Sequence, residues 1–245
     1  MKYHFTVSPD FTPEHIPGWF IFNTWMQKAL SEVIHLELYD NFESQRKAIQ
    51  SNEIDIIYAN PYDAAFLVRE KKFAPLVKPT GKSDEAIIAV HESSPFTCVE
   101  DLQPGTRISR TDDPDVNMMS MIMLEPAELD KQNTQSCTRD TYILVAKDLI
   151  QGNADIGFFL AEAFHDLSKL VRTQMRALVS SHIRIISHSL LVGPRMQPLT
   201  DTLLTALTDM SSSSPAVLES LGFDGWTLIN EEEMEFMIDL MDTLE

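Results

Sequence analysis

Two stretches of the chain, about one hundred residues apart, carry the same pattern and constrain the fold more than any other feature. Residues 49–58 read IQSNEIDIIY, and residues 150–159 read IQGNADIGFF. In each stretch a polar turn ends a helical pattern, and an aspartate opens an apolar run typical of a strand buried on both faces. A second helical pattern begins directly after each run, at Pro61 and at Ala161. The repeated order of helix, strand and helix predicts two similar α/β lobes, with ligands expected at the strand ends.

The apolar segments along the chain predict where each lobe begins and ends. Strands are expected at residues 3–7, 33–39, 54–59, 73–77, 85–91, 106–111, 134–138 and 183–192, and directly after Asp155. Helices are expected at residues 42–50, 62–72, 140–151, 199–210 and 231–240, with an aromatic-rich helix ending near residue 32 and a Met-rich helix around residues 118–123. The chain is expected to cross between lobes at the turn 80–83 and again along the strand 183–192. Lobe one should therefore comprise residues 1–84 and 190–245, and lobe two residues 85–189.

The composition is typical of a globular protein and argues against several classes of partner. A formal net charge of −18 and a pI near 4.7 disfavour nucleic acid and anionic membranes, since both attract cationic surfaces. The chain has 8 glycines, and neither a P-loop nor a dinucleotide-binding fingerprint occurs in it. Cys98 and Cys137 are too few to form a disulfide framework or, unaided, a thiolate metal site.

The start of the sequence bears on where the protein works. Residues 3–7 already alternate as a first strand does, and no basic segment followed by an apolar stretch marks a signal peptide. No apolar run is long enough to span a bilayer, so membrane insertion is not expected. The chain as written is expected in the cytoplasm, although a periplasmic protein whose leader had been removed would look the same.

Three segments together resemble the phosphonate- and phosphite-binding proteins of ABC importers. They are residues 52–61 (NEIDIIYANP), the second copy of the repeat at 152–157 (GNADIG), and residues 221–226 (LGFDGW). The resemblance covers almost the whole chain in the same order. It implies the type II periplasmic-binding-protein fold, in which two α/β lobes joined by two crossing strands close like a hinge on a ligand in the cleft between them.

The same resemblance implies candidate ligand-binding residues. Family members hold the phosphonate at a Ser/Thr-rich turn that opens a helix, assisted by a tyrosine and a histidine. Tyr58 matches the tyrosine on the first repeated strand. The turn falls on residues 112–117 (DDPDVN), whose carboxylates oppose a dianion, and helix capping is favoured there over a cation site. The histidine position falls near Arg139, which could clamp a single anion or form a surface pair with Asp140 or Asp113.

Three classes of function follow from these patterns. The first is a solute-binding protein that delivers a small, anionic molecule to an ABC transporter permease. The second is a cytoplasmic ligand sensor or interaction module with a signalling partner, and the third is a cofactor-free enzyme on the same scaffold. Ligand binding without catalysis is favoured, because Asn60, Asn117 and Glu162 form no recognisable catalytic set, and neither a cofactor nor a metal is expected. The predicted ligand-binding residues are Tyr58, Asn60, Tyr62 and Ser8 in lobe one, and Asn117, Thr138 and Arg139 in lobe two.

Overall fold

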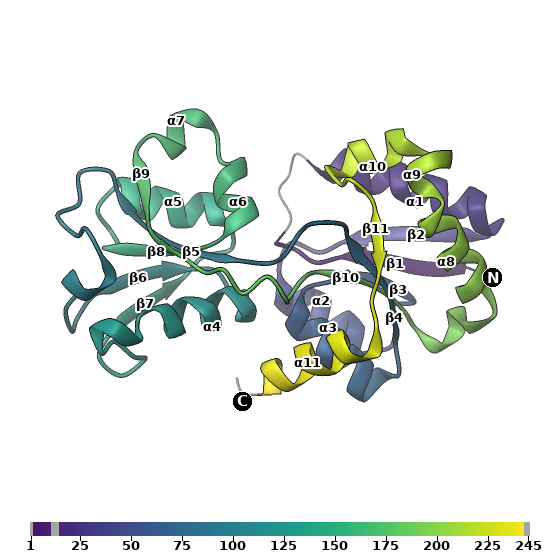
Figure 1. Cartoon of the computed structure of the whole chain (residues 1–245), viewed down its shortest axis with the longest axis horizontal. Helices are drawn as coiled ribbons and strands as arrows, with labels where there is room; N and C mark the ends of the chain where they lie inside the picture. The colour runs from purple at the N-terminus through teal and green to yellow at the C-terminus, as the bar shows by residue number, and fades with distance from the viewer. Residues whose placement is uncertain (1, 11–14, 243–245) are drawn as a thin grey trace. The chain divides into compact units, whose positions relative to one another are not determined.

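The computed structural model describes residues 2–10 and 15–242 of the chain (Figure 1). The chain divides into two compact units. Unit one consists of the residues up to Ser83 together with those from Ile185 onward, and unit two is the continuous segment Asp84–Arg184. Within the described part of the chain, none of the helices combines the length and the apolar character that crossing a membrane requires.

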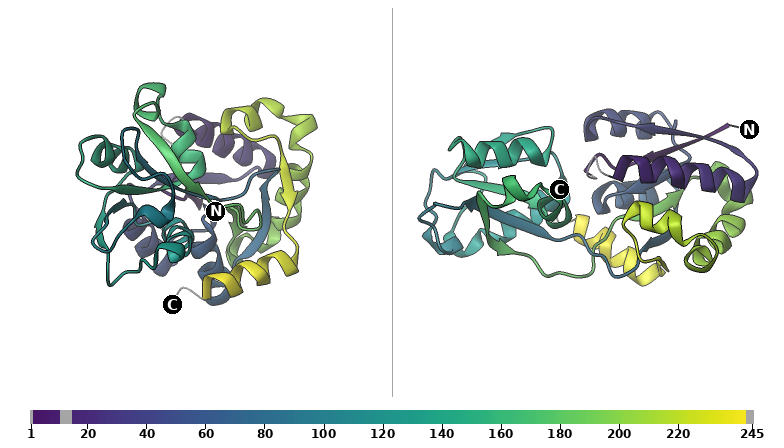
Figure 2. Two further views of the ribbon diagram at one scale, coloured as in Figure 1. Left: turned by 60° about the vertical axis from the view of Figure 1, so that its left-hand side comes forward. Right: turned by 90° about the horizontal axis from the view of Figure 1, so that it is seen from above.

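Unit one is built on a six-stranded sheet in the order β11-β4-β10-β3-β1-β2. Its strands are β1 (Lys2–Val7), β2 (Val33–Leu38), β3 (Ile56–Ala59), β4 (Ala74–Pro79), β10 (Ser189–Val192) and β11 (Trp226–Leu228). Strand β1 is parallel to β2 and β3, whereas β10 is antiparallel to β3 and β4. Its helices lie on both faces of the sheet (Figure 2), and they are α1 (Ile16–Leu30), α2 (Phe42–Gln50), α3 (Pro61–Lys71), the 3-10 helix η4 (Pro194–Leu199), α8 (Thr200–Thr208), α9 (Met210–Ser213), α10 (Pro215–Leu221) and α11 (Glu231–Asp242).

Unit two has a five-stranded sheet in the order β7-β6-β8-β5-β9. The strands are β5 (Ala86–His91), β6 (Arg107–Arg110), β7 (Gln135–Thr138), β8 (Ile156–Leu160) and β9 (Met175–Ser180). The helices are α4 (Pro114–Met123), α5 (Tyr142–Ile150), α6 (Ala161–Asp166) and α7 (Lys169–Arg172), with the 3-10 helices η2 (Val99–Asp101) and η3 (Glu125–Ala127). Strand β6 is parallel to β7 and β8, and β5 is antiparallel to β8 and β9.

The two sheets share one strand order. In unit one β1 lies between β2 and β3, and the antiparallel strand β10 separates β3 from β4; in unit two β6 lies between β7 and β8, and the antiparallel strand β5 separates β8 from β9. In both units this antiparallel strand is the first strand after the chain passes from one unit to the other: β5 in unit two and β10 in unit one. The predicted α/β fold of two similar lobes is therefore confirmed, and the repeat seen in the sequence marks the equivalent strands β3 and β8.

The aspartate of each repeat has the same structural role in both units. The Asp55 carboxylate accepts a hydrogen bond from the backbone N–H of His4 in β1 (2.9 Å) and pairs with Arg195 (Oδ1–Nη1 3.2 Å). The Asp155 carboxylate accepts a hydrogen bond from the backbone N–H of Arg107 in β6 (2.8 Å) and also pairs with the Arg107 guanidinium (Oδ1–Nη2 2.6 Å). Each aspartate thus attaches the turn before β3 or β8 to the parallel strand beside it, β1 or β6, which explains why both copies carry it.

The turn before that aspartate also has one geometry in both copies. Asn52 and Gly152 adopt the left-handed conformation, with φ of 56° and 71°. Asn and Gly tolerate this region better than other residues do. Their backbone N–H groups donate to the carbonyls of Ile49 and Leu149, each at 3.1 Å. The difference between NEI (residues 52–54) and GNA (residues 152–154) is therefore compatible with one backbone path.

The aromatic segment that opens α1 supplies the core of unit one. Trp19 and Phe22 are buried, as the sequence predicts, whereas Phe20 is exposed. The residue before Trp19 shows how closely α1 lies on α10: a Cβ added to Gly18 would stand 2.0 Å from the carbonyl oxygen of Ser220. Only a residue without a side chain fits at that position, so this glycine determines the packing of the two helices.

The predicted strand 183–192 is wrong in its first half. Strand β10 covers Ser189–Val192, and the preceding residues belong to no strand. The backbone N–H groups of Ile183 and Arg184 donate instead to the Glu85 carboxylate, at 2.9 and 2.7 Å. A side chain therefore satisfies the donors that a ladder would otherwise need. The boundary between the units lies after Arg184, five residues before the position that the sequence suggested.

Two strands escaped prediction from sequence. Strand β9 (Met175–Ser180) is mostly half-buried and shows no long apolar run. Strand β11 (Trp226–Leu228) has three residues, and its last two are exposed. Both lie at an edge of their sheet, where a strand buries less of its surface and the hydrophobic pattern is weak.

Candidate functional site

The strand ends of unit one bring residues from three distant segments to one edge of its sheet. Strands β1 and β3 are parallel, so their carboxyl ends meet at the same edge, and β10 starts there because it runs the other way. Ser189 lies opposite Ala59 in the register, and the backbone N–H of Ser8 donates to the Tyr58 carbonyl at 2.8 Å. Ser8, Tyr58 and Asn60, three residues predicted from sequence, are thus brought together, and each is buried.

Tyr58 lies at the centre of this edge. Its ring stacks on the imidazole of His188, with ring centroids 5.3 Å apart and an interplanar angle of 25°. The same ring also packs against the indole of Trp19, with ring centroids 4.8 Å apart. The His188 Nε2 atom lies 2.9 Å from Oδ2 of Asp10, and all three side chains at this contact, His188, Asp10 and Tyr58, are more than nine-tenths buried.

The Asp10 carboxyl is buried but kept ionised by its neighbours. Burial by itself would raise its pKa, but the charge and hydrogen bond of His188, with a smaller effect of Ser8, lower the pKa below the ordinary value. Neither Asp10 nor His188 was predicted as a site residue. The signal available in the sequence was the polar triplet 187–189, which interrupts an otherwise apolar segment.

Asn60 opens α3 and links the edge to a second buried carboxylate. Its Oδ1 atom caps the helix by accepting a hydrogen bond from the backbone N–H of Asp63 at 2.8 Å. The Asp63 carboxylate in turn accepts two hydrogen bonds from Arg46, at 2.7 and 3.1 Å, and the guanidinium lies 5.2 Å from the Tyr62 ring centroid. Burial raises the pKa of Asp63 more than Arg46 lowers it, and nearby Asp10 raises it further. Tyr62, half-buried, therefore covers an ion pair.

Two buried N–H donors at this edge have no hydrogen-bond partner among the described residues. They are Nδ2 of Asn60 and Nε1 of Trp19, and the two residues are 0% and 2% exposed. Buried N–H groups in proteins are almost always paired, with protein, water or ligand. An acceptor from a bound molecule would satisfy both donors.

In unit two, the acidic turn 112–117 caps the helix α4. Asp113 is the N-cap residue, and its Oδ1 atom accepts hydrogen bonds from the backbone N–H groups of Asp115 (3.2 Å) and Val116 (3.3 Å). Its Oδ2 atom accepts a hydrogen bond from the Tyr142 hydroxyl at 2.8 Å. The capping role predicted for this turn is therefore confirmed.

The remaining predicted residues of unit two lie near the neighbouring carboxyl ends of β6 and β7 but make separate contacts. Asn117 donates from Nδ2 to the Thr111 carbonyl at 3.0 Å, next to the capped turn. Thr138, the last residue of β7, is exposed. Arg139 binds neither Asp140 nor Asp113 in a surface pair; its guanidinium holds the Asp148 carboxylate on α5, with Nε–Oδ2 at 2.6 Å and Nη2–Oδ1 at 3.3 Å.

Replacing Arg139 by alanine is expected to lower the melting temperature of the protein. The hydrogen bond from Arg139 is the main cause that lowers the pKa of Asp148. Without it, the largely buried Asp148 carboxylate keeps only neutral donors, the hydroxyl of Ser109 and the amide of Asn153, among the hydrogen bonds described for it. Because the pKa of Asp148 is lowered in the fold, this stabilisation is present above the ordinary value of 3.8 and is lost as the pH falls through the folded value.

Calorimetric melts of Arg139→Ala at pH 7 and in acid check this prediction, with Lys147→Ala as the control. Lys147 is exposed on α5, the helix that carries Asp148, and its replacement also removes one positive charge. Equal melting temperatures for the two variants at neutral pH would contradict the structural role of Arg139.

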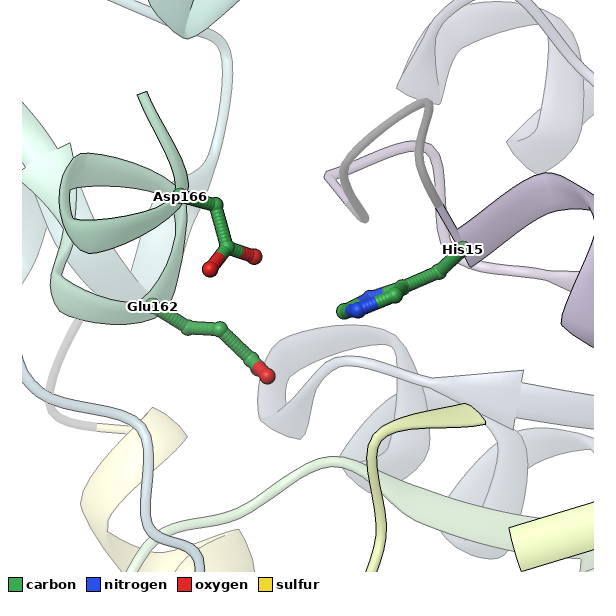
Figure 3. A group of neighbouring side chains, drawn as sticks. All are labelled: His15, Glu162 and Asp166. Carbon is green, nitrogen blue, oxygen red and sulfur yellow. The ribbon is translucent and has the colours of Figure 1, made fainter. Parts of the chain in front are cut away.

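Glu162, considered above for catalysis, lies in the first turn of α6, and Asp166 ends the same helix (Figure 3). Both carboxylates are exposed. His15, also drawn in Figure 3, belongs to unit one, where it is the N-cap residue of α1. Acidic residues one turn apart on an exposed helix are common, so this pair indicates no catalytic or metal site within unit two.

Comparisons with known proteins were made against families and solved structures. A family model described as the periplasmic substrate-binding protein of the phosphonate ABC transporter matches residues 5–234. A search of curated protein sequences gave no significant match.

Several solved structures are similar to the whole chain. PhnD1 from Prochlorococcus marinus, in complex with methylphosphonate, has a TM-score of 0.84 at 9% identity, over 99% of this chain and 98% of that one. A binding protein component of an ABC phosphonate transporter from Pseudomonas aeruginosa has a TM-score of 0.78 at 12% identity, over 100% and 89%. The periplasmic aliphatic sulphonate binding protein SsuA from Escherichia coli has a TM-score of 0.66 at 15% identity, over 99% and 87%. At these identities the similarity establishes the fold.

Proposed function

Because the chain belongs to the family of periplasmic substrate-binding proteins of phosphonate ABC transporters, we propose that it binds a small molecule at the β1–β3–β10 edge of unit one. The proposal includes a transporter permease as the partner that receives the ligand, and the periplasm as the place of binding. Its support is the family match over residues 5–234 together with the geometry of that edge.

The observation that carries the proposal is the buried polar cluster around Tyr58. A tyrosine stacked on a histidine, which is itself paired with a buried carboxylate, is a costly arrangement for a core and a common one for a binding site. The unsatisfied donors of Asn60 and Trp19 lie on residues that adjoin or contact Tyr58. A ligand that supplies acceptor atoms would complete the hydrogen bonding of this edge.

The chemistry of the edge favours a ligand with an oxygen-rich group. Of the four unsatisfied groups that the described residues place at this edge, Asn60 Nδ2 and Trp19 Nε1 are N–H donors. The Ser8 hydroxyl can donate as well, while Asp10 Oδ1 is an acceptor. Donors are complemented by carboxylate, sulfonate, phosphonate or carbonyl oxygens. Asp10 and Asp63 are already paired with His188 and Arg46, so their charges are balanced before a ligand binds. Unit one would therefore hold an anionic or neutral acceptor group mainly through hydrogen bonds.

The experiment is a thermal-shift screen of small carboxylates, sulfonates and phosphonates, followed by calorimetric titration of each compound that raises the melting temperature. Tyr58→Phe is expected to weaken binding of such a compound by about tenfold, the effect of losing one hydrogen bond of about 1.4 kcal/mol. Its melting temperature should stay close to that of the parent, because the ring keeps its contacts with Trp19 and His188.

The matched control is Tyr3→Phe, which removes the same hydroxyl from the opposite end of the same sheet. Its affinity should equal that of the parent. If no compound stabilised the parent chain, or if both phenylalanine variants bound equally well, the assignment of this edge would fail. Closure of the two lobes on the ligand remains a prediction, which small-angle scattering with and without a stabilising compound would test.

A further inference from the structure

The turn that opens α4 in unit two has every backbone donor of its first turn accounted for. Pro114, the first residue of the helix, has no N–H group. The N–H groups of Asp115 and Val116 donate to the Asp113 side chain, and that of Asn117 donates to the Asp113 carbonyl at 3.1 Å. A helix N-terminus attracts anions through free N–H groups, and this one has none left to offer.

The group that occupies these donors is itself an anion. The Asp113 carboxylate is 1% exposed and is held from its other side by the Tyr142 hydroxyl. It therefore stands in the place where an anionic ligand would be bound by the helix. A second carboxylate, that of Asp115, is 2% exposed two residues further on.

A separate observation indicates what the turn does accept. Asn117 donates from Nδ2 to the carbonyl of Thr111, and this hydrogen bond fixes the orientation of the amide. The Oδ1 atom of the same amide is then the remaining hydrogen-bonding atom, an acceptor. This Oδ1 is buried and has no hydrogen-bond partner in the described part of the chain, and the same holds for the Oγ1 of Thr111, a residue that is 5% exposed. An amide oxygen can only accept, so a partner for it must be a hydrogen-bond donor.

We infer that Asp113 is a specificity-determining residue, which closes this turn of unit two to phosphonate dianions and leaves it to a neutral or cationic, donor-bearing group of the ligand. The inference rests on the proposed function, because it concerns which small molecule the chain binds. It separates this chain from PhnD1, whose structure holds methylphosphonate, although the fold is the same. A dianion beside two buried carboxylates would meet repulsion that one neutral hydroxyl, that of Thr111, does not offset.

The test is calorimetric titration of methylphosphonate into the parent and into Asp113→Ser and Asp113→Asn. The parent should bind methylphosphonate weakly, because the edge of unit one can hold its oxygens and the turn of unit two cannot. Asp113→Ser removes the charge and frees at least one N–H group, so it should gain at least about tenfold in affinity. Asp113→Asn removes the charge but keeps an oxygen that can cap the helix, so it should gain less, and it also serves if the serine variant does not fold.

Asp112→Ser is the matched control, because it removes one charge from the same turn but from an exposed residue that does not cap the helix. It should behave as the parent does. No gain in affinity for methylphosphonate in folded Asp113→Ser and Asp113→Asn over the parent would overturn the inference. Failure of the proposed function would show differently, as the absence of any stabilising compound for the parent in the thermal-shift screen.

Discussion

Replacing Gly18 by alanine is expected to destabilise the protein by about 3 kcal/mol, near the upper end of the usual cost of overpacking. The added Cβ would stand 2.0 Å from the carbonyl oxygen of Ser220 and 2.7 Å from its carbonyl carbon. These are backbone atoms of α10, so the clash cannot be relieved by the rotation of a side chain. One of the two helices must shift, and the contacts of Trp19 and Phe22 with the sheet would shift with it.

Denaturant unfolding followed by tryptophan fluorescence measures this loss of stability. Gly225→Ala is the control, because its added Cβ would meet the hydroxyl oxygens of Ser211 and Thr80 at 3.1 and 3.3 Å, which can rotate away. A Gly18→Ala variant as stable as Gly225→Ala would mean that α1 and α10 pack less closely than the structure indicates.

Replacing His188 by alanine is expected to cost about 3–5 kcal/mol at pH 7, the range found when one partner of a buried ion pair is removed. The Oδ2 atom of Asp10 lies 2.9 Å from Nε2 of His188, and Asp10 is 7% exposed. Without the imidazole, burial would dominate and raise the pKa of Asp10, since burial is the largest single effect on that group. Tyr58 would also lose the ring on which it stacks.

The dependence on pH distinguishes the lost ion pair from the lost packing. In the parent the pKa of Asp10 is lowered, so its contribution to stability is present above the ordinary value of 3.8 and is lost as the pH falls through the folded value. The stability difference between parent and His188→Ala should therefore shrink from pH 7 towards acid, as Asp10 becomes protonated. The part that persists in acid measures the packing.

Unfolding curves at a series of pH values test this, with two controls. Adding Asp10→Asn to His188→Ala should restore part of the stability at pH 7, because the buried charge is then gone. His35→Ala breaks an exposed pair with Glu37 and should change the stability by less than about 1 kcal/mol. A stability difference for His188→Ala that is constant with pH would exclude the ion pair as its cause.

Much of the fold could be predicted because it is recorded in local patterns. The helix at residues 42–50 was predicted with the bounds that α2 has, and the two IQxN turns, each followed by an aspartate, indicated equivalent strands in both units. Such patterns are carried by neighbours in the chain, through capping, turn conformation and hydrophobic periodicity. The edge strands β9 and β11 were missed because the exposure of an edge weakens those patterns.

The candidate site was predictable only where one segment supplies it. Tyr58 and Asn60 follow from the repeat, since both stand at the end of a recognisable strand. The partner of Tyr58 comes from a segment 130 residues away in the sequence, and nothing local indicates that His188 reaches Asp10. The intramolecular partner of Arg139 was missed for the same reason: Asp148 lies about two turns into the next helix, whereas the sequence alone suggested the nearer carboxylates Asp140 and Asp113.

The central place of β10 has a consequence for how the molecule is made. Unit two is a continuous segment, so all its strands have been synthesised once Arg184 has left the ribosome. Unit one is different: β10, the strand between β3 and β4, follows roughly a hundred residues after β4. Until it emerges, β3 keeps an open edge and β4 lacks both of its neighbours, β10 and β11, so both strands risk pairing with another polypeptide.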